Sequence, residues 1–150
     1  MSTLNNYLET GRRFAESIPY SLVALVARLA VASVFWRSAR TKVEGILEIK
    51  GNTFFLFQEE YKVPLLPPDV AAYFATYAEH IFSVLLVIGL ASRLSALGLM
   101  IMTLVIQIFV YPGSWPDHFT WAAALIFLLA RGPGALSLDH LILRRFGGGS

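Results

Sequence analysis

Two long apolar stretches of this chain carry ionisable residues at a depth where a membrane helix is normally apolar. The first stretch, residues 19–36, contains Arg28 near its centre, and the second, residues 70–90, contains Glu79 and His80. A charge near the middle of a bilayer is costly, so it faces a partner or a cavity inside the protein. These residues therefore constrain the packing of the chain more than any other feature.

The composition predicts an integral membrane protein. The chain has 150 residues, of which 56% are hydrophobic and 15% are charged, whereas soluble domains carry roughly a quarter charged residues. A spanning helix needs about 20 apolar residues, so the predicted fold class is an all-α membrane protein, a four-transmembrane-helix bundle in a single domain over residues 1–146. The expected spans are about residues 19–36, 70–90, 94–110 and 115–130.

Several classes of function are excluded by what the sequence lacks. The chain contains no cysteine, which excludes disulfides, thiolate metal sites and CxxC redox chemistry. The formal net charge of +2 is small and its basic residues are scattered, so we expect no nucleic-acid partner. The bilayer is the expected partner, together with a further protein or a second copy of the chain. The last four residues, 147–150, are interpreted as a linker remnant.

The connection between the first two spans is long and partly apolar. Its segment Thr53-Phe54-Phe55-Leu56-Phe57 is too short to span, so we expect an interfacial or re-entrant segment. Glu59, Glu60 and Tyr61 follow it and are expected to fold back over the outer ends of the other spans. A short surface helix is expected over residues 137–146.

The distribution of basic residues predicts the orientation in the membrane. One group falls on the side of both termini and of the tight second connection, and cytoplasmic loops carry such an excess of Lys and Arg. We therefore expect a membrane protein with both termini cytoplasmic. A cleaved signal peptide over residues 19–33 is the alternative interpretation, although Arg28 interrupts it. The first group is Arg12, Arg13, Arg93, Arg131, Arg144 and Arg145, and the opposite group is Arg37, Arg40, Lys42, Lys50 and Lys62.

The depths of the buried charges predict an ion pair. Arg28 and Glu79 each lie about ten residues into their spans, or ~15 Å deep at ~1.5 Å per residue. A contact between opposite charges is the simplest way to tolerate both. Two interpretations stay open at this point, a structural lock between two helices and a pair that also lines a ligand cavity.

The second span carries two adjacent polar stripes at helical spacing. One includes Thr76, Glu79 and Ser83, and the other includes three aromatic residues, His80 among them. Two stripes are more than interhelical hydrogen bonding requires, which favours a polar cavity over simple helix contacts. The candidate ligand-cavity residues are Arg28, Tyr73, Tyr77, Glu79 and His80.

A second cluster of polar and aromatic residues is expected at the outer face. An aromatic belt with ordinary loop charges is the alternative interpretation, although it explains a pairing of His118 with Gln107 less well. Because His80 lies near the midplane and His118 near the surface, ~15 Å apart, their depths argue against a haem held by both, and no metal site is predicted. The cluster comprises Arg37, Lys42, Gln107, Tyr111, His118 and Trp121.

In order, these features resemble the DoxX family of small bacterial four-span membrane proteins. The resemblance rests on the arginine in Leu25-Val26-Ala27-Arg28-Leu29, on the Lys42 segment, on the acid-bearing second span that ends in Ile88-Gly89-Leu90-Ala91-Ser92-Arg93, and on the aromatic fourth span. It implies a membrane subunit of a redox or stress-response system in the bacterial inner membrane, since some members are associated with quinone-linked sulfur oxidation. The Phe-rich loop and Trp115-Pro116-Asp117-His118 resemble members encoded beside peptide- or metal-handling proteins.

Three functions follow as hypotheses, and whether the chain is an enzyme stays open. The first is a redox subunit that binds a quinone or similar carrier between the first two spans, with Glu79 or His80 relaying protons. The second is a non-catalytic membrane partner that docks a soluble protein or a peptide- or metal-handling component through its outer loops. The third, a proton or solute pathway, rests on the same intramembrane charges.

Overall fold

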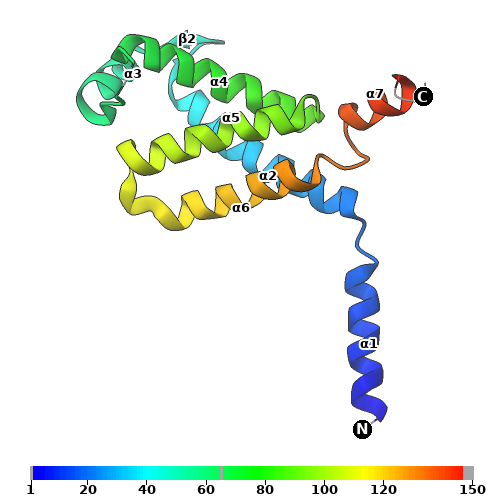
Figure 1. Ribbon diagram of the computed structural model, residues 1–150. Helices are drawn as coiled ribbons and strands as arrows, with labels where there is room; N and C mark the ends of the chain where they lie inside the picture. Colours follow the sequence, from blue (N-terminus) through cyan, green and yellow to red (C-terminus); the bar gives the residue numbers. More distant parts are fainter. Residues whose placement is uncertain (1, 65, 147–150) are drawn as a thin grey trace.

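The computed structural model describes residues 2–64 and 66–146, and its described part is mostly helical (Figure 1). Residues 147–150, interpreted as a linker remnant, lie outside the described residues. A two-stranded antiparallel hairpin pairs Val43 with Ile49 and Glu44 with Glu48. In chain order the elements are α1 (Ser2–Glu16), α2 (Tyr20–Thr41), β1 (Val43–Glu44), β2 (Glu48–Ile49), α3 (Gly51–Phe55), the π-helical η1 (Leu56–Tyr61), α4 (Pro68–Ile88), α5 (Ser92–Val105), the π-helical η2 (Ile106–Val110), the short η3 (Pro112–Ser114), α6 (Trp115–Arg131) and α7 (Leu138–Phe146).

Four helices pack side by side around one apolar core. α2 contacts α4 and α6, and α5 contacts the same two helices, so each helix has two neighbours. Small residues such as Ala24, Ala72 and Ala96, which are fully buried, let the backbones approach closely. The larger core side chains are Phe35, Leu86, Leu99, Leu125 and Leu128.

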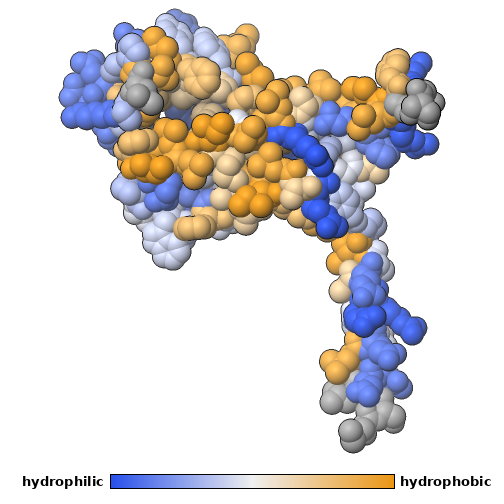
Figure 2. All heavy atoms as spheres, in the orientation of Figure 1, coloured by the Kyte–Doolittle hydropathy of each residue, from blue (hydrophilic) through white to orange (hydrophobic). Residues whose placement is uncertain are grey.

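The outside of this bundle is apolar over most of its length. Among the described residues, three helices are long and apolar enough to cross a membrane, namely α2, α4 and the continuous helix Ser92–Val110 formed by α5 and η2. α6 has 17 residues. Figure 2 shows the hydrophobic band on the flank of the bundle, and hydrophilic surface on α1 and at the far end of the bundle. This pattern is that of helices whose outer faces meet lipid.

The first spanning helix is longer at its C-terminal end than the sequence predicted. α2 continues to Thr41 instead of ending near residue 36, because Arg37, Arg40 and their neighbours extend it past the apolar stretch. Lys42 is therefore attached to the end of a rigid helix rather than to a loop. This one difference decides which charges meet inside the bundle.

A compact segment covers the end of the bundle opposite the two termini (Figure 1). We call residues 43–61 the cap; it comprises the β1–β2 hairpin, α3 and η1. The Lys42 carbonyl accepts hydrogen bonds from the Lys50 amide at 3.0 Å and from the Thr53 hydroxyl at 2.9 Å, and Phe57 packs against Ala71 and Ala72. The apolar segment of the long connection thus folds back onto the bundle.

The terminal helices lie at the other end. α7 confirms the short surface helix expected near residues 137–146. α1 was not anticipated from its polar sequence; its residues from 5 onward are exposed, and exposed i,i+4 ion pairs such as Arg12–Glu16 lie along it.

Candidate functional site

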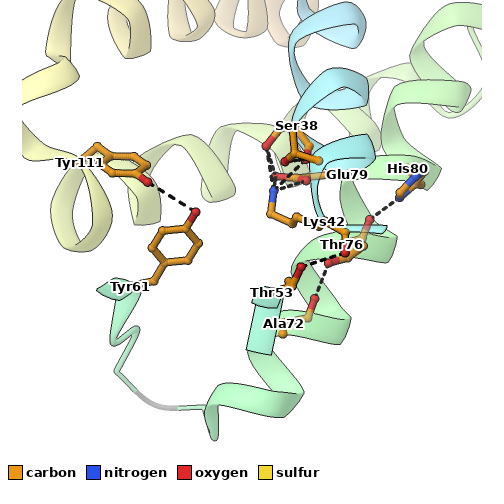
Figure 3. A network of polar contacts seen from close by, with 10 residues as sticks. Ser38, Lys42, Thr53, Tyr61, Ala72, Thr76, Glu79, His80 and Tyr111 are labelled. Atoms are coloured by element: carbon orange, nitrogen blue, oxygen red, sulfur yellow. Dashed lines mark hydrogen bonds and ion pairs between the residues drawn. The ribbon is translucent and has the colours of Figure 1, made fainter. Parts of the chain in front are cut away.

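The most buried ion pair joins Lys42, just past the end of α2, to Glu79, in the middle of α4. Lys42 Nζ lies 2.8 Å from Glu79 Oε2 and 3.1 Å from Oε1, and the two side chains are 11% and 2% exposed. The Ser38 hydroxyl, one turn earlier on α2, donates to Glu79 Oε1 at 3.1 Å and accepts from Lys42 Nζ at 2.8 Å. Figure 3 shows this closed network of three side chains, which we call the Lys42–Glu79 network.

The predicted ion pair between Arg28 and Glu79 is therefore wrong. The depth argument assumed that the two spans begin and end at the same levels, but the helices are offset. Gly89, just past the end of α4, lies against Arg28, as a Cβ built on it would overlap Arg28 Nη1. Lys42 lies about 20 Å further along the helix axis than Arg28, at ~1.5 Å per residue. Lys42 therefore reaches Glu79 instead.

Arg28 instead joins three segments at the end of the bundle that carries the termini. Its fully buried guanidinium donates to the Leu86 carbonyl at 3.3 Å and to the Leu136 carbonyl beyond α6. Gly89, at φ +72°, adopts a left-handed conformation that favours glycine, and the absence of a side chain there leaves room for the guanidinium. Arg28 thus links α2 to α4 and to the segment that follows α6.

The two polar stripes predicted on the second span have different surroundings. Thr76, Glu79 and Ser83 are all buried toward the bundle. Tyr73 and Tyr77 lie on the outside, 49% and 37% exposed, with their rings stacked 6.2 Å apart. The tyrosines therefore lie on the outer side of α4, where Tyr73 contacts Phe54 and Tyr77 donates to the Leu47 carbonyl of the cap.

His80 is separated from the exposed tyrosines of its stripe. Its Nδ1 lies 2.7 Å from the Thr76 carbonyl, which accepts the ring proton. The ring packs edge-on against Trp36 of α2 at 5.2 Å. Its Nε2 atom is buried and has no hydrogen-bond partner among the described residues, so His80 retains an unused acceptor beside the tryptophan.

Two members of the predicted outer cluster form a tight contact at the far end of α5 and α6. His118 is buried, and its Nδ1 lies 2.7 Å from Gln107 Oε1. The His118 ring also packs at 4.9 Å against Trp121. The amide nitrogen of Gln107 donates to the Pro112 carbonyl at 2.8 Å, which fixes the turn into α6. The pairing of Gln107 with His118 suggested by the sequence is present.

Tyr111 links the cap to the same end of the bundle. Its hydroxyl lies 3.3 Å from a carboxylate oxygen of Glu60 and 3.5 Å from the Tyr61 hydroxyl, so the expected fold-back of the residues after the apolar segment occurs. Burial, reinforced by the hydrogen bond with Tyr111 and by nearby acids, raises the pKa of the Tyr61 phenol. Tyr61 thus keeps its proton at neutral pH, and Figure 3 places it on the side of the cap that faces the Lys42–Glu79 network.

Arg37 joins neither group. It lines an open groove of about 550 Å³ along the outer part of α2, together with Trp36 and Arg40. Of the predicted outer cluster, Lys42 instead contacts Glu79, and Gln107, His118 and Trp121 lie together. Tyr111 contacts the cap. In residues 2–64 and 66–146, no three His, Asp or Glu side chains gather as a metal-binding set.

The sequence reasoning missed Lys42 as the partner of Glu79 and also missed Asp139. The four-residue spacing of Ser38 and Lys42 places both on one helix face, and this was the available signal for the first. Asp139 accepts hydrogen bonds from the Ala91 and Ser92 amides at 2.7 and 2.8 Å. It caps α5 from a distant part of the chain, and no local sequence pattern predicts such a contact.

Comparison with known proteins gives two matches. A family model described as DoxX matches residues 23–112, a range that contains both Lys42 and Glu79. A protein of Haemophilus influenzae (strain Rd), described as an uncharacterized protein, is 30% identical over 128 residues, which cover 79% of this chain and 82% of that protein. No solved structure matches.

Proposed function

Because the chain belongs to the DoxX family of membrane proteins, we propose that it is a membrane subunit of a redox or stress-response system. Its task in that system is to bind the head group of a quinone-like, lipid-soluble carrier beside the Lys42–Glu79 network. The observation that carries this proposal is the burial of a complete ion pair at the end of a spanning helix, directly under the cap.

Stability alone gives little reason for such a pair. Moving two charges out of water costs several kcal/mol per ion, and well-packed apolar residues of similar size often serve stability equally well. Ionisable groups inside a membrane bundle are functional candidates for the same reason. Retention of Lys42 and Glu79 in the interior therefore favours a role in binding or proton transfer.

One tyrosine and the buried lysine suit a carrier with two carbonyl groups. Tyr61 is a protonated hydroxyl that can donate a hydrogen bond, and Lys42 is a cation that can polarise a carbonyl oxygen. Glu79 is an acceptor for a proton released by the reduced carrier. Tyr61 ends the π-helical η1, and Gln107 lies in the π-helical η2; such irregular turns are frequent at functional sites.

The carrier's electrons must be exchanged with another protein, because this chain has no cysteine and the proposal assigns it no redox centre of its own. Reduction of a quinone to a quinol takes up two electrons and two protons. In this proposal the chain supplies the binding site and the route for the protons, while a partner supplies or removes the electrons.

In the membrane, we propose a single four-span domain in the bacterial inner membrane. α6 is the fourth span, since it runs beside α2 and α5 along the bundle. Both termini lie on the cytoplasmic side and the cap lies outside, which places Arg93 and Arg131 in the cytoplasmic head-group region. Cysteine-accessibility labelling of positions 46 and 143 tests the orientation, with only position 46 expected to react from outside.

The binding proposal is tested with a short-chain quinone and the protein reconstituted in nanodiscs. Glu79→Gln is expected to weaken equilibrium binding at least about tenfold, the equivalent of about 1.4 kcal/mol. Glu16→Gln makes the same chemical change at an exposed position of α1 and serves as the matched control. Equal affinity of wild type and Glu79→Gln, with both folded, would refute the proposal.

A second candidate is docking of a soluble protein or a peptide- or metal-handling component on the cap. The supporting observation is two exposed apolar side chains on the cap, Ile46 at 85% and Phe55 at 61%, with the acids Glu59 and Glu60 in the η1 turn that follows Phe55. Exposed apolar residues rimmed by charge are typical of interaction sites.

The docking candidate is tested by photo-crosslinking in native membranes. A crosslinker at position 46 is expected to capture one discrete soluble protein, and Ile46→Asp should abolish recovery of that protein on pull-down. Leu143 in α7, 68% exposed, is the control position at the other end of the molecule. The same capture pattern from both positions would contradict docking on the cap.

A further inference from the structure

A groove at the end of the bundle that carries the termini combines free basic groups with apolar walls. It has a volume of about 810 Å³ and lies where α2 and α5 begin and α6 ends. Arg93 and Arg131 line it, together with apolar side chains that include Leu94 and Ile142. In Figure 2, hydrophilic atoms cross the hydrophobic surface at this end of the bundle.

The two arginines are held toward the groove and carry no acidic partner. Arg131 stacks over the ring of Tyr20, with its guanidinium carbon 5.8 Å from the ring centre. The Arg93 guanidinium lies over Gly132, as a Cβ built on that glycine would be 3.5 Å from Arg93 Nη2. Within the described part of the chain, no carboxylate lies within 4 Å of either guanidinium.

The one acid of the groove is already engaged. Asp139 accepts the amide hydrogens of Ala91 and Ser92 at the start of α5, so its charge is directed into the helix end. Tyr20 donates to the Gly132 carbonyl at 2.6 Å, which fixes the loop that forms the groove floor. The groove therefore presents two unpaired positive groups from a rigid frame.

We propose that this groove binds an anionic phospholipid, with the phosphate between Arg93 and Arg131. Guanidinium groups match phosphate oxygens in geometry and charge, and basic pockets between spanning helices are suited to anionic head groups. The apolar side chains beside the arginines, with Leu94 62% and Ile142 44% exposed, provide the surface along which acyl chains lie. A free phosphate ion would leave that apolar wall unused.

The site is distinct from the Lys42–Glu79 network and lies at the opposite end of the bundle. Its test uses native mass spectrometry of the full chain in detergent, with phosphatidylglycerol and phosphatidylcholine of identical acyl chains. The wild type is expected to prefer phosphatidylglycerol about 30-fold, the equivalent of about 2 kcal/mol at about 1 kcal/mol per arginine, and the preference is expected to fall as salt rises.

The variants separate this groove from general surface charge. Arg93→Gln combined with Arg131→Gln is expected to remove most of the preference. Arg144→Gln combined with Arg145→Gln removes the same charge from exposed positions on α7 and is expected to keep it. If the first variant fails to fold, each single substitution, Arg93→Gln or Arg131→Gln, is expected to lower the preference about fivefold, the equivalent of about 1 kcal/mol.

Three results would overturn the proposal. One is a wild type that binds both lipids equally. Another is an equal loss in the α7 control, which would assign the preference to diffuse charge. The third is displacement of the lipid by inorganic phosphate at a comparable concentration, which would identify a site for the free anion instead.

Discussion

Removing one charge of the Lys42–Glu79 pair is predicted to harm the protein more than removing both. Lys42→Met leaves the Glu79 carboxylate, 2% exposed, without a cation, and Glu79→Gln leaves the ammonium without a carboxylate. Loss of one partner from a buried pair costs about 3–5 kcal/mol. For a chain of this size that corresponds to a fall in Tm of roughly 10 °C.

The double variant restores electrostatic balance. With Met at 42 and Gln at 79, the amide still has the Ser38 hydroxyl as a partner, and no charge is buried. We expect this variant to lie within about 1 kcal/mol of the wild type, since neutral replacements of buried pairs are often tolerated. The coupling energy from the double-mutant cycle should then exceed about 2 kcal/mol.

The assay is thermal unfolding in detergent, followed by circular dichroism at equal detergent-to-protein ratio. The control cycle uses Arg12 and Glu16, which are 3.0 Å apart but 78% and 62% exposed; exposed pairs of this kind contribute little to stability. Additive losses in the buried cycle, or equal coupling in both cycles, would refute the reasoning that burial makes the pair strong.

Three further changes test the contacts that hold the bundle and the cap. Gly89→Ala is predicted to destabilise the protein by about 2 kcal/mol or more, because a left-handed backbone and the Arg28 guanidinium leave no room for a methyl group; a Tm equal to that of the wild type would contradict this. Asp139→Asn removes a charge-assisted cap from the start of α5 and is predicted to cost about 1 kcal/mol, seen as faster amide exchange in the first turn; unchanged exchange would count against the cap. Thr53→Val removes the hydroxyl that binds the Lys42 carbonyl and should speed proteolysis within the cap, whereas an unchanged cleavage rate would show that the bond does not hold the cap.

The lengths of the apolar stretches and the turn residues between them were enough to predict most helices. The stretches around residues 70–90 and 94–110 correspond to α4 and to the continuous α5–η2 helix, because apolar composition and the turn at Gly89 mark their limits. The C-terminal surface helix also followed from pattern. α1 did not, since most of its residues are polar and its apolar side chains Tyr7, Leu8 and Phe14 are too few to indicate a span.

The partners of the buried charges could not be predicted, because they depend on helix offset. Counting residues from the ends of apolar stretches placed Arg28 and Glu79 at one depth, but α2 runs past its apolar stretch and positions Lys42 there instead. A shift of a few residues along a helix moves a side chain by ~1.5 Å each, and composition does not determine it. The predicted stripe of Thr76, Glu79 and Ser83 needed only rotation about one helix, and all three side chains are buried.

The most direct test of the proposed carrier site is photolabelling with a quinone analogue in native membranes. The proposal predicts saturable labelling of peptides around Lys42, Tyr61 and Glu79, with unlabelled quinone as competitor and with strong reduction in Glu79→Gln. Labelling that does not saturate, or that spreads evenly over the lipid-facing helices and is unchanged in that variant, would contradict the central claim.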